Sequence, residues 1–124
     1  MVMIAQKIVL VADGHADSRM IYSAVLEFGG FSVLEASSGL EALAMMPAQM
    51  PHAIVTELKF PDSRSCEMLK RVKLDPMTAH IPVLIVTSDI RPGTRQRAEE
   101  DGCDAFRTKP CPPYDVLELV RQLT

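Results

Sequence analysis

The sequence has no long apolar run and no large excess of charge of either sign. Its 124 residues carry 13 Lys and Arg against 16 Asp and Glu, a net charge of -3. Neither nucleic acid nor an anionic membrane is therefore an expected partner. No apolar stretch approaches the roughly 20 residues that a transmembrane helix needs. Repeats, low-complexity tracts and linkers are also missing, so we expect one globular domain over residues 1–124.

The cysteines form no recognisable pair. There are three, Cys66, Cys103 and Cys111, without CxxC or histidine-paired spacing. This pattern favours reduced thiols in a cytoplasmic protein over a disulfide framework or a metal site. The apolar stretch over residues 1–12 is interrupted by Gln6 and Lys7 and lacks a charged leader region, so we do not expect a signal peptide.

What the sequence does contain is an alternation of short apolar runs with helical patterns. The apolar runs predict strands over 8–12, 31–36, 53–57, 82–87 and 104–108. Helices are expected over 17–28, from 38 to about the proline at 47, over about 65–74, over 94–101 and from about 113 onward. This order predicts the α/β class, as a single (βα)5 doubly wound, flavodoxin-like domain. Its parallel five-stranded sheet should have the order 2-1-3-4-5.

The helical patterns also predict which side chains face the core. Asp17 is expected to cap the first helix, and Ser38 with Glu41 has capping-box spacing for the second. Pro47 should shorten or kink that second helix. The segment 94–101 holds a single apolar residue and should pack thinly. The residues expected to face inward are Met20, Ile21, Ala24, Val25, Phe28, Leu40, Leu43, Met46, Met68, Leu69, Val72, Val116, Leu117, Val120 and Leu123.

Four polar side chains follow or end the predicted strands. Because parallel strands point their carboxyl ends the same way, Asp13, Glu57, Thr87 and Lys109 should meet at one edge of the sheet. Two carboxylates, a hydroxyl and an ammonium suit phosphate or metal chemistry, in which a metal holds the acids and the lysine grips phosphoryl oxygens. The alternative is that these are ordinary polar residues at strand ends.

Several motifs in order resemble the receiver domain of two-component response regulators. They are residues 7–13 followed by Arg19, residues 30–36 with 39–43, residues 80–88, and Thr108-Lys109-Pro110. Members of this family take a phosphoryl group from a histidine kinase onto an aspartate at the end of the third strand, with Mg²⁺ held by an acidic pair. The resemblance implies that Thr87 is the switch hydroxyl and Lys109 the phosphate-binding lysine. It also implies that Phe106 is the switch aromatic, although a plain core aromatic is the alternative, and that a cis peptide precedes Pro110.

The sequence departs from the family at three positions. Glu57 stands where the family has its phosphoacceptor aspartate, Gly14 replaces one of two adjacent acids, and Ser65 replaces a glycine. Mg²⁺ demands near-ideal octahedral oxygen ligands, so losing a carboxylate should leave at most a weak site at Asp13 and Glu57. The extra methylene of Glu57 moves its carboxylate away from an arrangement made for in-line attack. We therefore expect no resident cofactor, no catalytic residue and no enzyme activity.

The interpretation that follows is a pseudo-receiver, a protein-interaction module without the usual phosphorylation. Glu57 offers one charge and two oxygens, and it either mimics a phosphoryl group in part or is a relic beside Lys109. Expected partners are a histidine kinase, an output domain or a downstream regulator. A second copy of the chain is another, through the fourth helix, fifth strand and fifth helix.

Two other functions remain open from the sequence. One is a working receiver that accepts a phosphoryl group with Mg²⁺. The other is a flavodoxin-like binder of a flavin or nucleotide, disfavoured because no glycine-rich loop follows the first strand. His15 lacks a second ligand at metal spacing and is expected to be solvated. The segment containing Arg91, Arg95 and Arg97 is read as a solvated helix face, with a partner-binding patch as the alternative.

Overall fold

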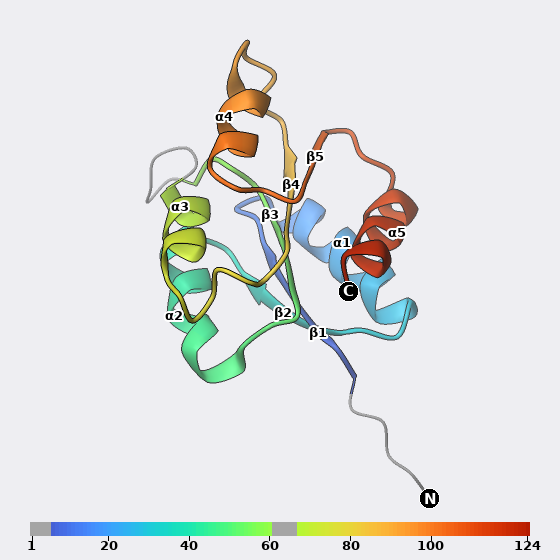
Figure 1. The fold of residues 1–124 in the computed structure, drawn as a ribbon. Helices are drawn as coiled ribbons and strands as arrows, with labels where there is room; N and C mark the ends of the chain where they lie inside the picture. Colours follow the sequence, from blue (N-terminus) through green and yellow to red (C-terminus); the bar gives the residue numbers. More distant parts are fainter. Residues whose placement is uncertain (1–5, 61–66) are drawn as a thin grey trace, which may run out of the picture.

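The computed structural model describes residues 6–60 and 67–124, and within them strands and helices alternate as predicted (Figure 1). Ser65 and Cys66 lie outside the described residues, and so does the predicted start of the third helix at about residue 65. The strands are β1 Ile8–Ala12, β2 Ser32–Ala36, β3 Ala53–Thr56, β4 Val83–Thr87 and β5 Ala105–Thr108. The helices are α1 Ala16–Phe28, α2 Gly39–Gln49, α3 Glu67–Leu74, α4 Thr94–Glu100 and α5 Pro113–Leu123.

The five strands form one parallel sheet in the order β2-β1-β3-β4-β5, which confirms the predicted topology. The register places Leu10 of β1 opposite both Leu34 of β2 and Ile54 of β3. The central strands β1, β3 and β4 are apolar apart from the buried threonines that end β3 and β4, because helices cover both of their faces. The edge strand β2 is less buried than the central strands.

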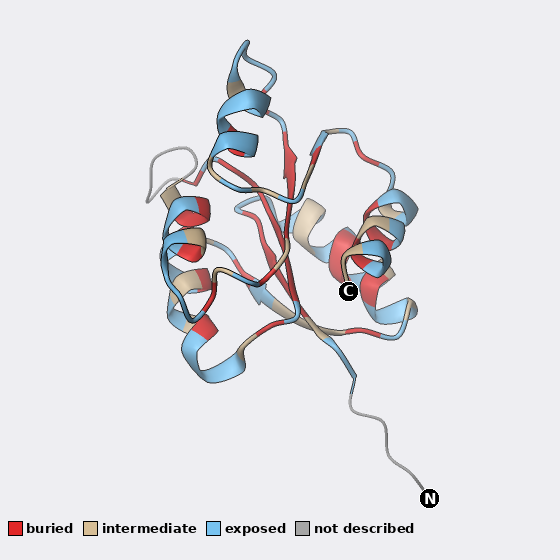
Figure 2. Cartoon of the chain, viewed as in Figure 1, coloured by how far each residue is buried: buried red, intermediate tan, exposed pale blue. Residues whose placement is uncertain are grey.

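Helices cover both faces of the sheet and divide the core into two clusters (Figure 2). On one face α2, α3 and α4 pack around Leu10, Ile54 and Ile85. On the other face α1 and α5 pack around Val11, Val55 and Leu84. Alternate residues of the same strands feed the two clusters, since successive strand side chains point to opposite faces. Within the described residues, no helix is long and apolar enough to cross a membrane.

The first helix differs from the prediction in both its cap and its buried face. Its N-cap is His15, without a side-chain bond, and Asp17 lies in the first turn. The buried residues are Tyr22, Ser23 and Leu26. The predicted inward residues Met20, Ile21, Ala24 and Phe28 are exposed instead, and Val25 alone is partly buried. The prediction was wrong because apolar side chains occur on both sides of α1, and α5 together with the sheet selects the other side.

The remaining helices follow the prediction more closely. The Ser38 hydroxyl accepts a hydrogen bond from the Glu41 backbone N–H at 3.1 Å, which confirms the N-cap of α2. Met46 is buried and Leu43 partly buried, but Leu40 is exposed. The helix continues past Pro47 to Gln49, so the proline does not end it. The predicted inward faces of α3 and α5 are confirmed, with Leu123 partly buried, and Ala98 is the buried residue of the thinly packed α4.

Candidate functional site

The carboxyl edge of the sheet brings together the polar residues that the strand order predicted. Asp13 follows β1, Glu57 follows β3, Thr87 ends β4 and Lys109 follows β5. Asp13, Glu57 and Thr87 are buried, with exposures of 3%, 4% and 0%. Buried carboxylates are rare unless they are paired or hydrogen-bonded, so their partners decide what this edge can do.

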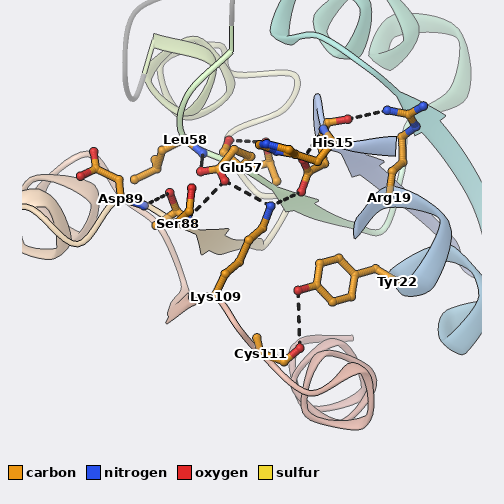
Figure 3. A network of polar contacts seen from close by, with 12 residues as sticks. His15, Arg19, Tyr22, Glu57, Leu58, Ser88, Asp89, Lys109 and Cys111 are labelled. Carbon is orange, nitrogen blue, oxygen red and sulfur yellow. Dashed lines mark hydrogen bonds and ion pairs between the residues drawn. The ribbon is translucent and has the colours of Figure 1, made fainter. Parts of the chain in front are cut away.

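Lys109 is the centre of the site (Figure 3). Its Nζ lies 2.8 Å from Asp13 Oδ2 and 3.3 Å from Glu57 Oε2, so one ammonium bridges the two acids. The Lys109 backbone N–H donates to the Thr87 carbonyl at 2.8 Å, and the peptide bond to Pro110 is cis, as the resemblance implied. These contacts hold the lysine over the ends of β1 and β3.

The other carboxylate oxygens accept hydrogen bonds from backbone N–H groups. Asp13 Oδ1 accepts from His15 N at 2.8 Å, and Glu57 Oε1 accepts from Leu58 N at 2.8 Å. Glu57 Oε2 also accepts from Ser88 N at 3.3 Å. Each of the four carboxylate oxygens therefore has at least one donor within the chain. The backbone donors were missed from the sequence, because side-chain patterns do not reveal which loop amides turn inward.

The cluster of Asp13, Glu57 and Lys109 carries one excess negative charge inside the protein. Tyr22 of α1 lies beside it, with its hydroxyl 3.5 Å from the carbonyl oxygen of Cys111. Burial, together with smaller electrostatic contributions from Cys111, Asp13 and Glu57, raises the pKa of Tyr22 to about 12. Burial likewise raises the pKa of the Cys111 thiol, so this cysteine is not an activated nucleophile.

The two residues proposed as switch elements lie on β4 and β5. The Thr87 hydroxyl accepts from the Asp89 backbone N–H at 3.0 Å rather than bonding to Glu57. Phe106 is 5% exposed and so points into the core. The guanidinium of Arg95 lies 5.8 Å from the centre of its ring, within the range of a cation–π contact.

A second charged group beside the site was missed from the sequence. Asp89 has a buried side chain, and both of its carboxylate oxygens accept from the exposed Arg91, at 2.9 and 2.7 Å. Lys59, from the loop after β3, lies 3.8 Å from the same carboxylate. Hydrogen bonds from Arg91 hold the pKa of Asp89 well below its usual range. The available signal in the sequence was an acid, Asp89, two residues before an arginine, Arg91, in the loop that follows β4.

The other residues singled out from the sequence are not part of the cluster of Asp13, Glu57 and Lys109. His15 is largely exposed, as predicted, although its ring Nδ1 lies 3.5 Å from Asp13 Oδ1. Gly14 is exposed and places no side chain in the site. Arg91 is bound to Asp89 at 2.7 Å and Arg95 to Glu99 at 2.8 Å, and both arginines line one hollow beside Phe106, so a partner-binding patch here stays a prediction.

Comparison with known proteins agrees with this geometry. The family model for the response regulator receiver domain matches residues 9–121. The chain is 30% identical over 119 residues to an uncharacterised 14.6 kDa protein from the sodA1 3′ region of Leptolyngbya boryana, covering 96% of this chain and 91% of that protein. It is 27% identical over 115 residues to the polar-differentiation response regulator DivK of Brucella ovis, covering 93% and 94%.

Solved structures with the same fold include the chemotaxis response regulator CheY4 of Vibrio cholerae. That structure has a TM-score of 0.88 and 24% identity, covering 97% of this chain and all of the other. A putative response regulator from Chloroflexus aurantiacus has a TM-score of 0.89 and 24% identity, covering 96% and 98%. Receiver domains are signalling modules that interact with histidine kinases or other regulatory proteins, rather than conventional enzymes. With its strand order, its sheet-edge acids and the match over residues 9–121, this chain belongs to the response regulator receiver family.

Proposed function

We propose that this chain is a pseudo-receiver, a cytoplasmic protein-interaction module that does not accept a phosphoryl group in the usual way. The observation that carries the proposal is the ion pair between Glu57 Oε2 and Lys109 Nζ at 3.3 Å, shared with Asp13 at 2.8 Å. The lysine that would grip phosphoryl oxygens is therefore already held by two carboxylates. The acceptor oxygens of Glu57 are themselves bound by Leu58 N and Ser88 N.

The same contacts argue against a strong Mg²⁺ site. Mg²⁺ needs oxygen ligands in octahedral geometry, and it competes poorly for carboxylates that already accept charge-assisted hydrogen bonds. The described residues include no group of three or more acidic, histidine or cysteine ligands, and Gly14 supplies no carboxylate. The donor set is therefore a poor fit to Mg²⁺, with at most a weak site at Asp13 and Glu57, and we assign this chain no metal-dependent step.

Glu57 also acts, under this proposal, as a partial substitute for a phosphoryl group. Its carboxylate reaches Lys109 and the Ser88 backbone N–H, and Phe106 is buried. The Thr87 hydroxyl is not among its partners. A single carboxylate with two oxygens replaces only part of the contacts of a phosphate with three. Glu57 therefore favours one conformation of the domain only to the extent that its contacts are stronger in that conformation than in the other.

Treatment with acetyl phosphate and Mg²⁺, followed by intact mass measurement, tests the proposal. Phosphoryl transfer would form a bond from phosphorus to a Glu57 oxygen and release acetate. We expect no mass increase in the wild-type chain. The double variant Gly14→Asp/Glu57→Asp restores both family acids and serves as the positive control, which should gain one phosphoryl group. A stoichiometric adduct on wild-type Glu57, absent from Glu57→Gln, would show that the chain is a working receiver.

The mimic role has its own test. Glu57→Gln keeps the shape but removes the charge, and Glu57→Asp withdraws the carboxylate from Lys109. Both should change self-association or partner affinity at the face formed by α4, β5 and α5, measured by sedimentation velocity and by titration with a partner. If wild type and both variants had the same self-association and partner affinity, Glu57 would not act as a phosphoryl mimic.

A further inference from the structure

The turn that follows α3 carries exposed apolar side chains. Leu74, the last residue of α3, is 81% exposed, and Met77, three residues later, is 68% exposed. Pro76 between them is exposed as well. Solitary exposed apolar residues such as Ile90 are ordinary, but apolar residues gathered in one turn are more typical of an interaction site. We call Leu74, Pro76 and Met77 the α3 patch.

Hydrogen bonds fix the conformation of this turn. The Thr78 hydroxyl donates to the Val72 carbonyl at 2.8 Å, and the Met77 backbone N–H donates to the Asp75 carboxylate at 2.9 Å. Lys73 Nζ donates to two carbonyl oxygens further along the turn, at 3.3 and 2.8 Å. The α3 patch is thus held in place before any partner arrives, and a preorganised surface loses less conformational entropy on binding.

Charge on α3 identifies the kind of partner. The helix carries Lys70, Arg71 and Lys73 against one acid, Glu67, whereas each of the other four helices has at least as many acids as cations. Lys70 and Arg71 are exposed, and their spacing of four and three residues from Leu74 places them on the same side of the helix. Arg71 lies 3.5 Å from Glu67, a long pair at the surface that neutralises it only weakly. The border of the α3 patch is thus basic, in a chain whose net charge is -3.

We propose that the α3 patch docks an amphipathic helix of another protein, one whose apolar stripe is flanked by aspartate and glutamate. Its apolar side chains would cover Leu74 and Met77, and its carboxylates would meet Lys70 and Arg71, which raises the association rate and fixes orientation. A second copy of this chain, related by a two-fold axis, is a poor occupant because it would bring the same cations together. An anionic membrane is also a poor occupant, since it would repel a chain of net charge -3.

This inference adds a surface to the proposed function and does not depend on phosphoryl chemistry. The turn after α3 leads into the start of β4 at Val83, whereas Glu57 and Lys109 follow the ends of their strands. In a parallel sheet these are opposite edges, so the α3 patch lies at the other end of the domain from the ion pairs. Phosphorylation in the mass measurement would leave the patch untouched, and failure of a peptide to bind here would leave the absence of phosphorylation untouched.

A matched pair of synthetic peptides tests the proposal on the full chain. Both are helical and carry leucine at the same positions of one face, flanked by glutamate in the first peptide and by lysine in the second. Titration of the glutamate peptide into the ¹⁵N-labelled protein should shift amide resonances of residues 70–80. The lysine peptide should bind at least about tenfold more weakly. Equal binding of both peptides, no binding, or shifts confined to other elements would overturn the proposal.

Variants on the exposed side chains make the test specific. Leu74→Ser/Met77→Ser should abolish binding of the glutamate peptide without changing the circular dichroism spectrum, because both side chains are exposed. Lys70→Glu/Arg71→Glu keeps the apolar side chains and should reverse the preference between the two peptides. Ile90→Ser, which removes a similarly exposed apolar residue in the loop after β4, is the control and should bind normally. Normal binding by either double variant would overturn the proposal.

Two further measurements distinguish the other occupants. Sedimentation velocity should show no dimer that Leu74→Ser/Met77→Ser dissolves, and such a dimer would show a second copy as the occupant. Vesicles of phosphatidylserine and phosphatidylcholine should leave the chain in the supernatant after centrifugation. Cosedimentation that the same double variant abolishes would show a membrane as the occupant. Either result would overturn the proposal.

Discussion

The sheet edge and the outer side of α1 invert the usual distribution of residues in opposite ways. At the sheet edge, Asp13 and Glu57 are charged groups kept almost entirely from water. On α1, Met20 and Phe28 are large apolar groups left largely in water. Each arrangement is costly by itself, since buried charge loses its hydration and exposed apolar surface gains nothing from folding.

The two regions differ in how the cost is met. The carboxylates at the sheet edge find their partners inside the chain, in Lys109 and in loop amides. Met20 and Phe28 of α1 stay largely exposed and take no part in either core cluster. The contrast is between a cluster of ion pairs formed within the chain and an apolar helix side exposed to solvent.

Replacing Lys109 by methionine should have the largest effect on stability. The change leaves two buried carboxylates facing each other without a cation, and we expect a loss of about 3–5 kcal/mol in the free energy of unfolding. Urea denaturation followed by circular dichroism measures it. The triple variant Asp13→Asn/Glu57→Gln/Lys109→Met removes all three charges and should recover most of that loss. Equal instability of the single and triple variants would mean that packing of the lysine stem, not its charge, stabilises the edge.

The second prediction compares two apolar residues of α1 that differ in burial. Leu26→Ala should cost about 2–5 kcal/mol, because it leaves a cavity in the core cluster shared with α5. Phe28→Ala, two residues further on, should change the free energy of unfolding by no more than about 0.5 kcal/mol. Chemical denaturation of both variants gives the comparison. A large cost for Phe28→Ala would show that its ring packs against the rest of the chain.

Asp89→Asn should weaken the link between the loops that follow β3 and β4. It replaces a charge-assisted pair with Arg91, and because Arg91 is exposed we expect a loss of about 1–2 kcal/mol at neutral pH. The lowered pKa of Asp89 means that the unfolded chain binds the proton more readily. The stabilisation is therefore full above the ordinary value of 3.8 and is lost as pH falls below it.

Urea midpoints measured between about pH 6 and about pH 2 separate this contribution from those of other acids. The difference between wild type and Asp89→Asn should narrow as the pH falls. A difference that stays constant over this range would assign the cost to altered shape rather than to lost charge.

The smallest expected effect on stability is that of replacing Tyr22, which lies between the two regions. Its pKa is raised from 10.0 to about 12, so the buried phenol stabilises the fold fully below pH 10. That contribution is lost as the pH rises toward 12. Tyr22→Phe should reduce the alkaline loss of stability and cost less than about 1 kcal/mol at neutral pH, since the bond to the Cys111 carbonyl is long at 3.5 Å. Thermal unfolding along an alkaline pH series measures both.

Much of the fold could be predicted because the strand signals are unambiguous. The runs 8–12 and 83–86 are continuously apolar, as is typical of strands covered on both faces. Parallel strands then require their ends to meet, which correctly brought Asp13, Glu57 and Lys109 together. The site was predictable to this extent because it follows from topology and from the residue types alone.

The errors arose where tertiary contacts choose between equal local patterns. Both sides of α1 are apolar, so helical periodicity could not decide between Phe28 and Leu26, and packing against α5 decided it. The partners of Glu57 at Leu58 N and Ser88 N depend on loop conformation. Asp89 was missed because its burial depends on Arg91 and Lys59 covering it from two separate loops.

The bridging ammonium of Lys109 has a consequence for how such a module carries information. The phosphorylated fraction of a conventional receiver reports the recent activity of its kinase. That signal decays at the rate at which the phosphoryl group is hydrolysed. Under the proposed function, the ion pairs at the sheet edge are formed by the chain's own side chains, so they are not removed by hydrolysis as a phosphoryl group is. The output of this chain would then follow its abundance, and its timing would be set by synthesis and degradation.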